Sequence, residues 1–190
     1  MTLPRGFPLA TLRGDQEISR IHRSARDPWW FSTDGSGRFD PVGSGSGSYY
    51  FAKEPTAAWI EVFRKQILLA DDEVNQRSLY KLRLGRDLKL ADITSRRALQ
   101  FGVTASLGAN EDYTASHTFA AEALASGFDG IRYLVRHDPA QKLYGYALFG
   151  QPGSGAATFA PSAAAIDDSI PDILVDEARR LFGYRVLPTL

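Results

Sequence analysis

Cysteine is absent from this chain of 190 residues, and methionine occurs only once. The lack of thiols excludes disulfide frameworks, thiolate zinc sites, iron–sulfur clusters and cysteine nucleophiles, and it fits a reducing compartment. Long apolar runs are also missing. No segment approaches the roughly 18 apolar residues of a membrane span, and the first residues contain no apolar run of signal-peptide length. We therefore expect a cytoplasmic protein that has no contact with a membrane.

The chain has no excess of charge of either sign, since 22 Lys and Arg residues are balanced by 22 Asp and Glu residues. A net charge of zero gives no overall field that would attract nucleic acid, so we expect no direct nucleic-acid partner. The length suits one domain with a proper core. Aromatic residues are 12% of the chain, with Trp29 beside Trp30 and Tyr49 beside Tyr50. Clustered rings suit a core or a pocket for a flat ligand.

Several common catalytic and binding motifs are missing as well. His22, His117 and His137 show no metal-ligand spacing with one another or with nearby carboxylates, so we assign no metal. No serine lies in a Gly-x-Ser-x-Gly elbow, and no phosphate-binding lysine follows the glycines of the Gly-Ser tract at 43–48. That tract lies between segments that belong to one domain, so we predict a mobile loop over a site.

The residues that are present predict a mixed α+β domain. An alternating strand over 18–22 places Arg20 and His22 on one face, and a second strand spans 48–52. A helix is predicted from Pro55 to Leu69, with Trp59 on its apolar face and Glu61 on the other side. The remaining predicted elements are strands at 78–84 and 88–93, helices at 95–101 and 110–126, a hairpin of 131–135 with 143–149, a terminal helix at 171–182 and a strand at 184–187.

Four polar residues in these elements each have an ordinary explanation. Arg20 could pair with a carboxylate at the sheet surface, and Glu61 could be a solvated helix residue. Tyr50 could be a core ring, and Arg38 a surface loop residue. No single one of the four decides a function.

Together, however, the ordered segments that carry them resemble a known family. The segments Ile-Ser-Arg-Ile-His at 18–22, Gly-Arg-Phe-Asp at 37–40, Tyr-Phe-Ala at 50–52 followed by Ala-Ala-Trp-Ile-Glu at 57–61, and Gly-Phe-Asp-Gly-Ile-Arg-Tyr at 127–133 look like the successive motifs of the RES domain. The resemblance runs from about residue 16 to residue 150. It implies a fold related to that of ADP-ribosyltransferases. It also implies a toxin of a bacterial toxin–antitoxin pair that consumes NAD.

The resemblance also implies roles for individual residues. Arg20 matches the family arginine and Glu61 the family glutamate, and we take both as catalytic. Cleavage of the nicotinamide–ribose bond develops positive charge on the ribose, which a carboxylate stabilises. A guanidinium fork suits the pyrophosphate of NAD, or inorganic phosphate if phosphate replaces water as co-substrate. NAD is thus a substrate, and no cofactor is expected. The predicted substrate-binding residues are Arg38, Tyr50, Tyr49 and His22.

One departure from the family pattern concerns its serine, which is expected a few residues after Gly130 and Ile131. Val135 stands at the aligned position, and valine forms no side-chain hydrogen bond. Arg136 and His137 are the neighbouring candidates to take over the role of the hydroxyl. Three consequences stay open: a changed acceptor, weaker NAD turnover, or a retained fold without activity.

We therefore predict a RES domain over 1–150 and an extension over 151–190 whose terminal helix packs on the same domain. The predicted function is NAD degradation by phosphorolysis or hydrolysis. The alternatives are ADP-ribosylation of a protein acceptor and a non-catalytic module that binds a partner. In this family the usual partner is a helix-turn-helix antitoxin of the Xre type, and the tail offers a surface for that partner or for self-association.

Overall fold

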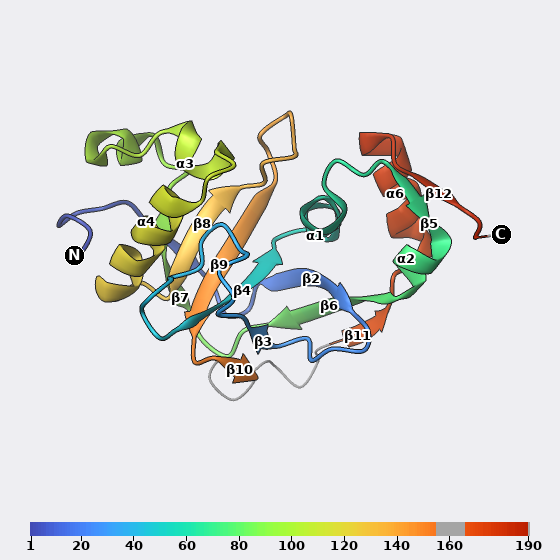
Figure 1. The fold of residues 1–190 in the computed structure, drawn as a ribbon, viewed down its shortest axis with the longest axis horizontal. Coiled ribbons are helices and arrows are strands. Elements are labelled where there is room, and N and C mark those ends of the chain that lie inside the picture. Colours follow the sequence, from blue (N-terminus) through green and yellow to red (C-terminus); the bar gives the residue numbers. More distant parts are fainter. Residues whose placement is uncertain (155–165, 190) are drawn as a thin grey trace.

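One mixed eight-stranded sheet organises the computed structural model, which describes residues 1–154 and 166–189 (Figure 1). All neighbouring strands of this sheet are antiparallel except β7 and β8, which are parallel. Its order is β1 (Leu9–Leu12), β7 (Leu88–Asp92), β8 (Gly130–Leu134), β9 (Tyr144–Gly150), β4 (Gly47–Ala52), β2 (Glu17–Arg23), β6 (Arg77–Arg83) and β11 (Ile166–Ser169).

Two small sheets and six helical segments complete the described residues. The small sheets are β3 (Trp30–Phe31) with β10 (Gly153–Ser154), and β5 (Leu68–Ala70) with β12 (Arg185–Leu187). The helical segments are α1 (Pro55–Phe63), α2 (Asp71–Asn75), the 3₁₀ helix η1 (Arg96–Phe101), α3 (Ala105–Ala109), α4 (Thr114–Ala125) and α6 (Asp172–Phe182). This mixture of helices with a mixed sheet confirms the predicted α+β class.

The large sheet is almost divided between β2 and β4. Seven residue pairs join β2 to β6 and six join β4 to β9, but only Ser19 and Ala52 join β2 to β4. The other end of β4 is occupied instead by the segment after β3, where Ser32 pairs with Ser48. That approach requires glycine at position 47, because a Cβ there would lie 2.9 Å from the main-chain oxygens of Phe31 and Ser32. The strands β2 and β4 therefore diverge.

Apolar side chains hold helices against both halves of the sheet. On one half, Phe119 and Ala123 of α4 share a buried cluster with Ile131 of β8. On the other half, α1 and α6 share a cluster with the face of β2 and β6 that carries Ile21 and Leu79. Helix α1 lies over the junction of β4 with β2, with α6 and β12 beside it (Figure 1). The C-terminal elements thus support the helix that carries Glu61.

Most predicted strands are confirmed, whereas two predicted helices have wrong ends. The strands at 18–22, 48–52, 78–84 and 88–93, the hairpin β8–β9 and the terminal helix all occur within two residues of the predicted limits. The helix predicted over 55–69 ends at Phe63, and β5 begins at Leu68. The helix predicted over 110–126 begins only at Thr114. Turns occupy 42–45, and the last two residues of the Gly-Ser tract belong to β4.

Candidate active site

A cleft of about 980 Å³ opens where β2 and β4 diverge. Its walls come from both strands, from α1, from the segment 32–40 and from the end of β8. The volume lies near the top of the roughly 300–1,000 Å³ range of small-molecule sites. Five carboxylates line it: Asp27, Asp34, Asp40, Glu61 and Glu111. Eight cationic side chains line it: Arg20, Arg23, Arg26, Arg38, Arg64, Lys65, Arg77 and Arg136. A chain of zero net charge thus has an excess of cations around this cleft, which suits an anionic ligand.

Glu61 lies on the cleft side of α1. Trp59 and Phe63 bury the opposite side of the helix in the core, which turns Glu61 toward the cleft. Burial raises the pKa of Glu61 from 4.5 to about 7, against the opposing effect of the Arg64 and Arg38 guanidiniums. Near neutral pH the carboxyl group is therefore poised between its two protonation states.

Arg20 reaches the same cleft from β2. Its guanidinium carbon lies 4.3 Å from the centre of the Tyr49 ring, and its Nη1 is buried without a hydrogen-bond partner. No carboxylate of the described residues lies within ion-pair distance of Arg20. The ordinary explanation of a paired sheet arginine therefore does not apply within the described part of the chain. An unpaired donor at the cleft favours an anionic ligand.

Tyr49 does not line the cleft. Its side chain is 0% exposed, and its ring stacks on Trp29 at 4.7 Å with an interplanar angle of 15°. Because successive strand residues point to opposite faces, only one of Tyr49 and Tyr50 can face the cleft, and that one is Tyr50. The position of Tyr49 does not support the predicted contact with substrate. The Tyr49 ring instead packs against the Arg20 guanidinium.

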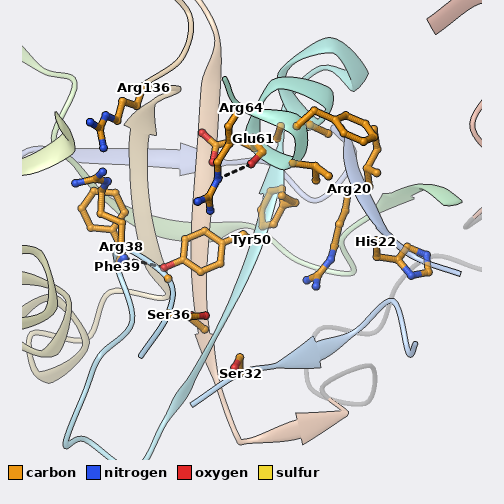
Figure 2. Close-up of a pocket in the computed structure, with 18 of the residues that line it drawn as sticks. Arg20, His22, Ser32, Ser36, Arg38, Phe39, Tyr50, Glu61, Arg64 and Arg136 are labelled. Atoms are coloured by element: carbon orange, nitrogen blue, oxygen red, sulfur yellow. Dashed lines mark hydrogen bonds between the residues drawn. The ribbon is translucent and has the colours of Figure 1, made fainter. Parts of the chain in front are cut away.

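Tyr50 and Asp40 fix the loop that carries Arg38. The Tyr50 hydroxyl donates to Asp40 Oδ1 at 2.9 Å and accepts from the main-chain N–H of Phe39 at 2.7 Å (Figure 2). Asp40 Oδ2 accepts from the main-chain N–H of Gly37 at 2.8 Å. A Cβ at Gly37 would lie 2.6 Å from the Tyr50 hydroxyl, so the turn packs directly against the ring. Tyr50 is thus a rigid cleft wall whose hydroxyl is already engaged.

This loop directs Arg38 to the cleft. The Arg38 guanidinium carbon lies 4.4 Å from the centre of the Tyr113 ring, and Nη1 donates to the main-chain oxygen of Asn110. As with Arg20, no carboxylate of residues 1–154 and 166–189 pairs with it. Figure 2 shows Arg38 and Arg136 on one side of Tyr50 and Arg20 on the other. Guanidiniums from separate segments therefore surround one space.

His22 is held by the protein on both ring nitrogens. Nδ1 lies 2.9 Å from the main-chain oxygen of Arg23, and Nε2 lies 2.9 Å from Asp167 Oδ1 of β11. The ring is buried at the end of the cleft. With both nitrogens engaged, His22 anchors β11 to β2, and a contact with substrate would require one of these bonds to open.

The residues that align with the family serine lie in different surroundings. Val135 is 0% exposed and packs in the core cluster of α1 and α6, so it does not line the cleft. Arg136 does line the cleft, with Nη2 3.5 Å from Glu111 Oε1. The pKa of the neighbouring His137 is lowered by burial and then by Arg136. Of these three residues, Arg136 and His137 can reach a ligand and Val135 cannot.

Arg64, Ser32 and Ser36 also line the cleft, although no pattern in the sequence marks them as site residues. The sequence predicts Arg64 inside a helix that in fact ends before it, and no local motif marks the two serines. A cluster of three or more His, Asp or Glu side chains that could hold a metal does not occur within the described ranges. No helix of those ranges is long and apolar enough to cross a membrane.

Comparisons with known proteins agree with this architecture. A protein-family model for the RES domain matches residues 17–168, which includes β10 and all but the last residue of β11. Among solved structures, a chain in the crystal structure of the M. tuberculosis MbcT–MbcA toxin–antitoxin complex superposes with a TM-score of 0.62 and 16% sequence identity. The alignment covers 90% of this chain and 92% of that chain. A search of curated proteins gave no match.

Proposed function

The chain belongs to the RES domain family, and from this membership and the cleft we propose that it is a toxin that degrades NAD by cleaving the nicotinamide–ribose bond. The observation that carries the proposal is the composition of the cleft. One carboxylate with a raised pKa, Glu61, lines it together with Arg20 and Arg38, which have no carboxylate partner among the described residues. The pyrophosphate of NAD is a dianion that arginines can bind. Cleavage of NAD develops positive charge on the ribose, which a carboxylate can stabilise.

The reaction follows from the charge on each group. As the bond between C1′ and the nicotinamide nitrogen breaks, the electron pair leaves with nicotinamide, and the ribose becomes oxocarbenium-like. Ionised Glu61 stabilises this positive charge. Arg20 and Arg38 hold the pyrophosphate through charge-assisted hydrogen bonds. A water or phosphate oxygen then bonds to C1′, and water gives up its proton to solvent. Nicotinamide leaves as a neutral molecule, so no strong general acid is required.

Val135 does not weaken this proposal. Its side chain lies in the core, so a hydroxyl at this position would not face the cleft in the observed structure. Other hydroxyl and cationic groups do line the cleft, including Ser32, Ser36 and Arg136. The loss of the family serine is therefore not by itself a loss of a cleft contact, and this favours an enzyme over a non-catalytic module.

We extend the proposal to a protein partner. The similar solved structure is that of a toxin–antitoxin complex, and a toxin that consumes NAD needs an inhibitor in its own cell. An antitoxin of the Xre type that covers the cleft would fulfil this role. Co-expression with a helix-turn-helix protein encoded beside this chain, followed by co-purification and loss of NAD cleavage, tests this part. Cleavage at the full rate in the presence of that protein would contradict it.

Nicotinamide release from NAD by the purified protein tests the activity. We expect release by the wild type, and a loss of at least about 100-fold in Glu61→Gln and Arg20→Ala, the size of one lost electrostatic contact in a transition state. Arg179→Ala, which changes an exposed arginine of α6, is the control. Addition of phosphate distinguishes phosphorolysis from hydrolysis, and labelled NAD with lysate reveals protein ADP-ribosylation. Equal rates in the wild type and both cleft variants would refute the proposal.

A further inference from the structure

Arg64 adopts a backbone conformation that normally requires glycine. It has φ 51° and ψ −119°, directly after the last residue of α1. The main-chain N–H of Gln66 donates to the oxygen of Phe63 at 3.0 Å, so residues 63–66 form a β-turn with Arg64 at its first central position. These angles are those of the first central position of a type II′ turn, a position that is typically glycine. An arginine here is strained, and strained residues cluster at functional sites.

The C-terminal segment holds Arg64 in this conformation. The Tyr184 hydroxyl donates to the main-chain oxygen of Arg64 at 2.6 Å. The main-chain N–H of Arg185 donates to the main-chain oxygen of Ile67 at 2.7 Å. The Tyr184 ring packs edge-on against Trp59 of α1 at 5.7 Å. These contacts come from residues beyond 168, where the family match ends. The strained turn is thus maintained by residues that lie outside the range matched by the family model.

The strained turn directs the Arg64 side chain into the cleft. Figure 2 shows the guanidinium extending from the end of α1 toward Tyr50, beside Glu61. Its Nε donates to the main-chain oxygen of Glu61 at 3.3 Å, which leaves the terminal nitrogens directed away from the helix. No carboxylate of the described residues pairs with the side chain. Among the charged groups, Arg64 has the largest effect in lowering the pKa of Glu61, so the two lie close together.

We propose that Arg64 is a phosphate-binding residue of the cleft and that Tyr184 is the residue that positions it. The ligand is a phosphate group, either the pyrophosphate of NAD or inorganic phosphate, and in naming these two sources the inference rests on the proposed function. A guanidinium that contributes a charge-assisted hydrogen bond to phosphate accounts for the presence of arginine at a position that favours glycine.

Arg64→Gly tests the side chain without harming the turn, because glycine adopts φ 51° freely. Gln141→Gly is the matched control, since Gln141 is the other non-glycine residue with positive φ in the described ranges and does not line the cleft. Calorimetric titration with inorganic phosphate, and with NAD in the Glu61→Gln background so that NAD is not consumed, gives the binding constants. We expect Arg64→Gly to bind one or both about 10- to 100-fold more weakly, the loss of one such hydrogen bond. Its melting temperature should be no lower than that of the wild type, and Gln141→Gly should bind normally.

The ligand that is affected identifies the source of the phosphate group. Weaker binding of NAD alone assigns Arg64 to the pyrophosphate, and weaker binding of inorganic phosphate alone assigns it to the co-substrate. Wild-type affinity of Arg64→Gly for both ligands, or no binding of either by the wild type, would overturn the inference. A wild type that binds NAD without releasing nicotinamide would refute the proposed function. The ratio of the binding constants of the wild type and Arg64→Gly would still decide whether Arg64 binds phosphate.

Tyr184→Phe tests the positioning role, because it removes the donor to Arg64 and keeps the ring against Trp59. We expect binding of the affected ligand to weaken by about 3- to 10-fold. In the Arg64→Gly background the same change should weaken it no further, since Tyr184 acts through Arg64. If Tyr184→Phe weakened binding equally in the wild type and in Arg64→Gly, its effect would be merely structural, which would contradict the positioning role.

Discussion

Glu61→Gln should stabilise the folded protein at neutral and alkaline pH while it abolishes NAD cleavage. Arg64, Arg38 and Tyr133 are the ionisable neighbours of the Glu61 carboxyl group, and burial outweighs the two arginines. Because the pKa of Glu61 rises from 4.5 to about 7 on folding, the folded state binds more protons than the unfolded state between these two pH values. The free energy of unfolding therefore falls as pH rises from 4.5 to about 7.

The size of the effect follows from this change in pKa. A rise from 4.5 to about 7 corresponds to about 3 kcal/mol, and we take this as an upper limit because the side chain is partly open to solvent. Glutamine has nearly the same shape and no charge, so it removes this unfavourable contribution above pH 7. For a chain of this length, up to about 3 kcal/mol raises the melting temperature by up to roughly 5 to 10 °C.

Thermal and denaturant unfolding of the wild type and Glu61→Gln across pH 4.5 to 8.5 measures the effect. The difference between the two proteins should be close to zero at the acid end and largest above about pH 7.5. Glu17→Gln, at an exposed position of β2, should show no comparable dependence on pH. A difference that is constant across the pH range, or a Glu61→Gln variant that is less stable at pH 8, would refute the argument that the ionised carboxylate is poorly solvated.

Three further substitutions test the framework of the cleft. Val135→Ser should lower stability by about 1–3 kcal/mol by placing a hydroxyl in the core, and any gain in nicotinamide release would contradict the orientation of this residue. Gly47→Ala should destabilise by about 1–3 kcal/mol, because the new Cβ would meet Ser32 O at 2.9 Å; an unchanged denaturation midpoint would contradict this close approach. Tyr50→Phe should lower stability by about 1–2 kcal/mol, since the hydroxyl accepts from Phe39 N–H; an unchanged melting temperature would show that this bond contributes little.

The strands of the cleft could be predicted from the sequence because a two-residue period is a local signal. The alternation at 18–22 placed Arg20 in a strand, and the apolar face of Trp59 and Phe63 placed Glu61 on the opposite side of a helix. Neither pattern reports which strands are neighbours. The divergence of β2 from β4 depends on Gly47 and on Ser32, which approaches β4 from another part of the chain. The cleft is therefore a tertiary feature, built from elements that were individually predictable.

The turn after α1 shows most clearly where local reasoning fails. The residues at 63–66 contain neither glycine nor proline, and their pattern continues that of the helix, so the sequence predicts helix through Leu69. The conformation of Arg64 depends instead on the hydroxyl of Tyr184, 120 residues further along the chain. Because the contact with Tyr184 cannot be predicted from local sequence, neither can the position of Arg64 in the cleft. In the predicted helix, an arginine at this position would be a solvated surface residue.

The guanidiniums of the cleft oppose an effect that an anionic ligand would have on Glu61 in the proposed reaction of NAD. An anionic ligand close to Glu61 would raise the pKa of this group further and favour its neutral form, in which it cannot stabilise a cationic ribose. Arg38 and Arg64 act in the opposite direction, since both lower the pKa of Glu61. Cations that bind the phosphate groups thus also keep the carboxylate ionised. Loss of Arg64 should accordingly weaken binding and move the acid limb of the pH–rate profile to higher pH, two effects that a surface arginine would not produce together.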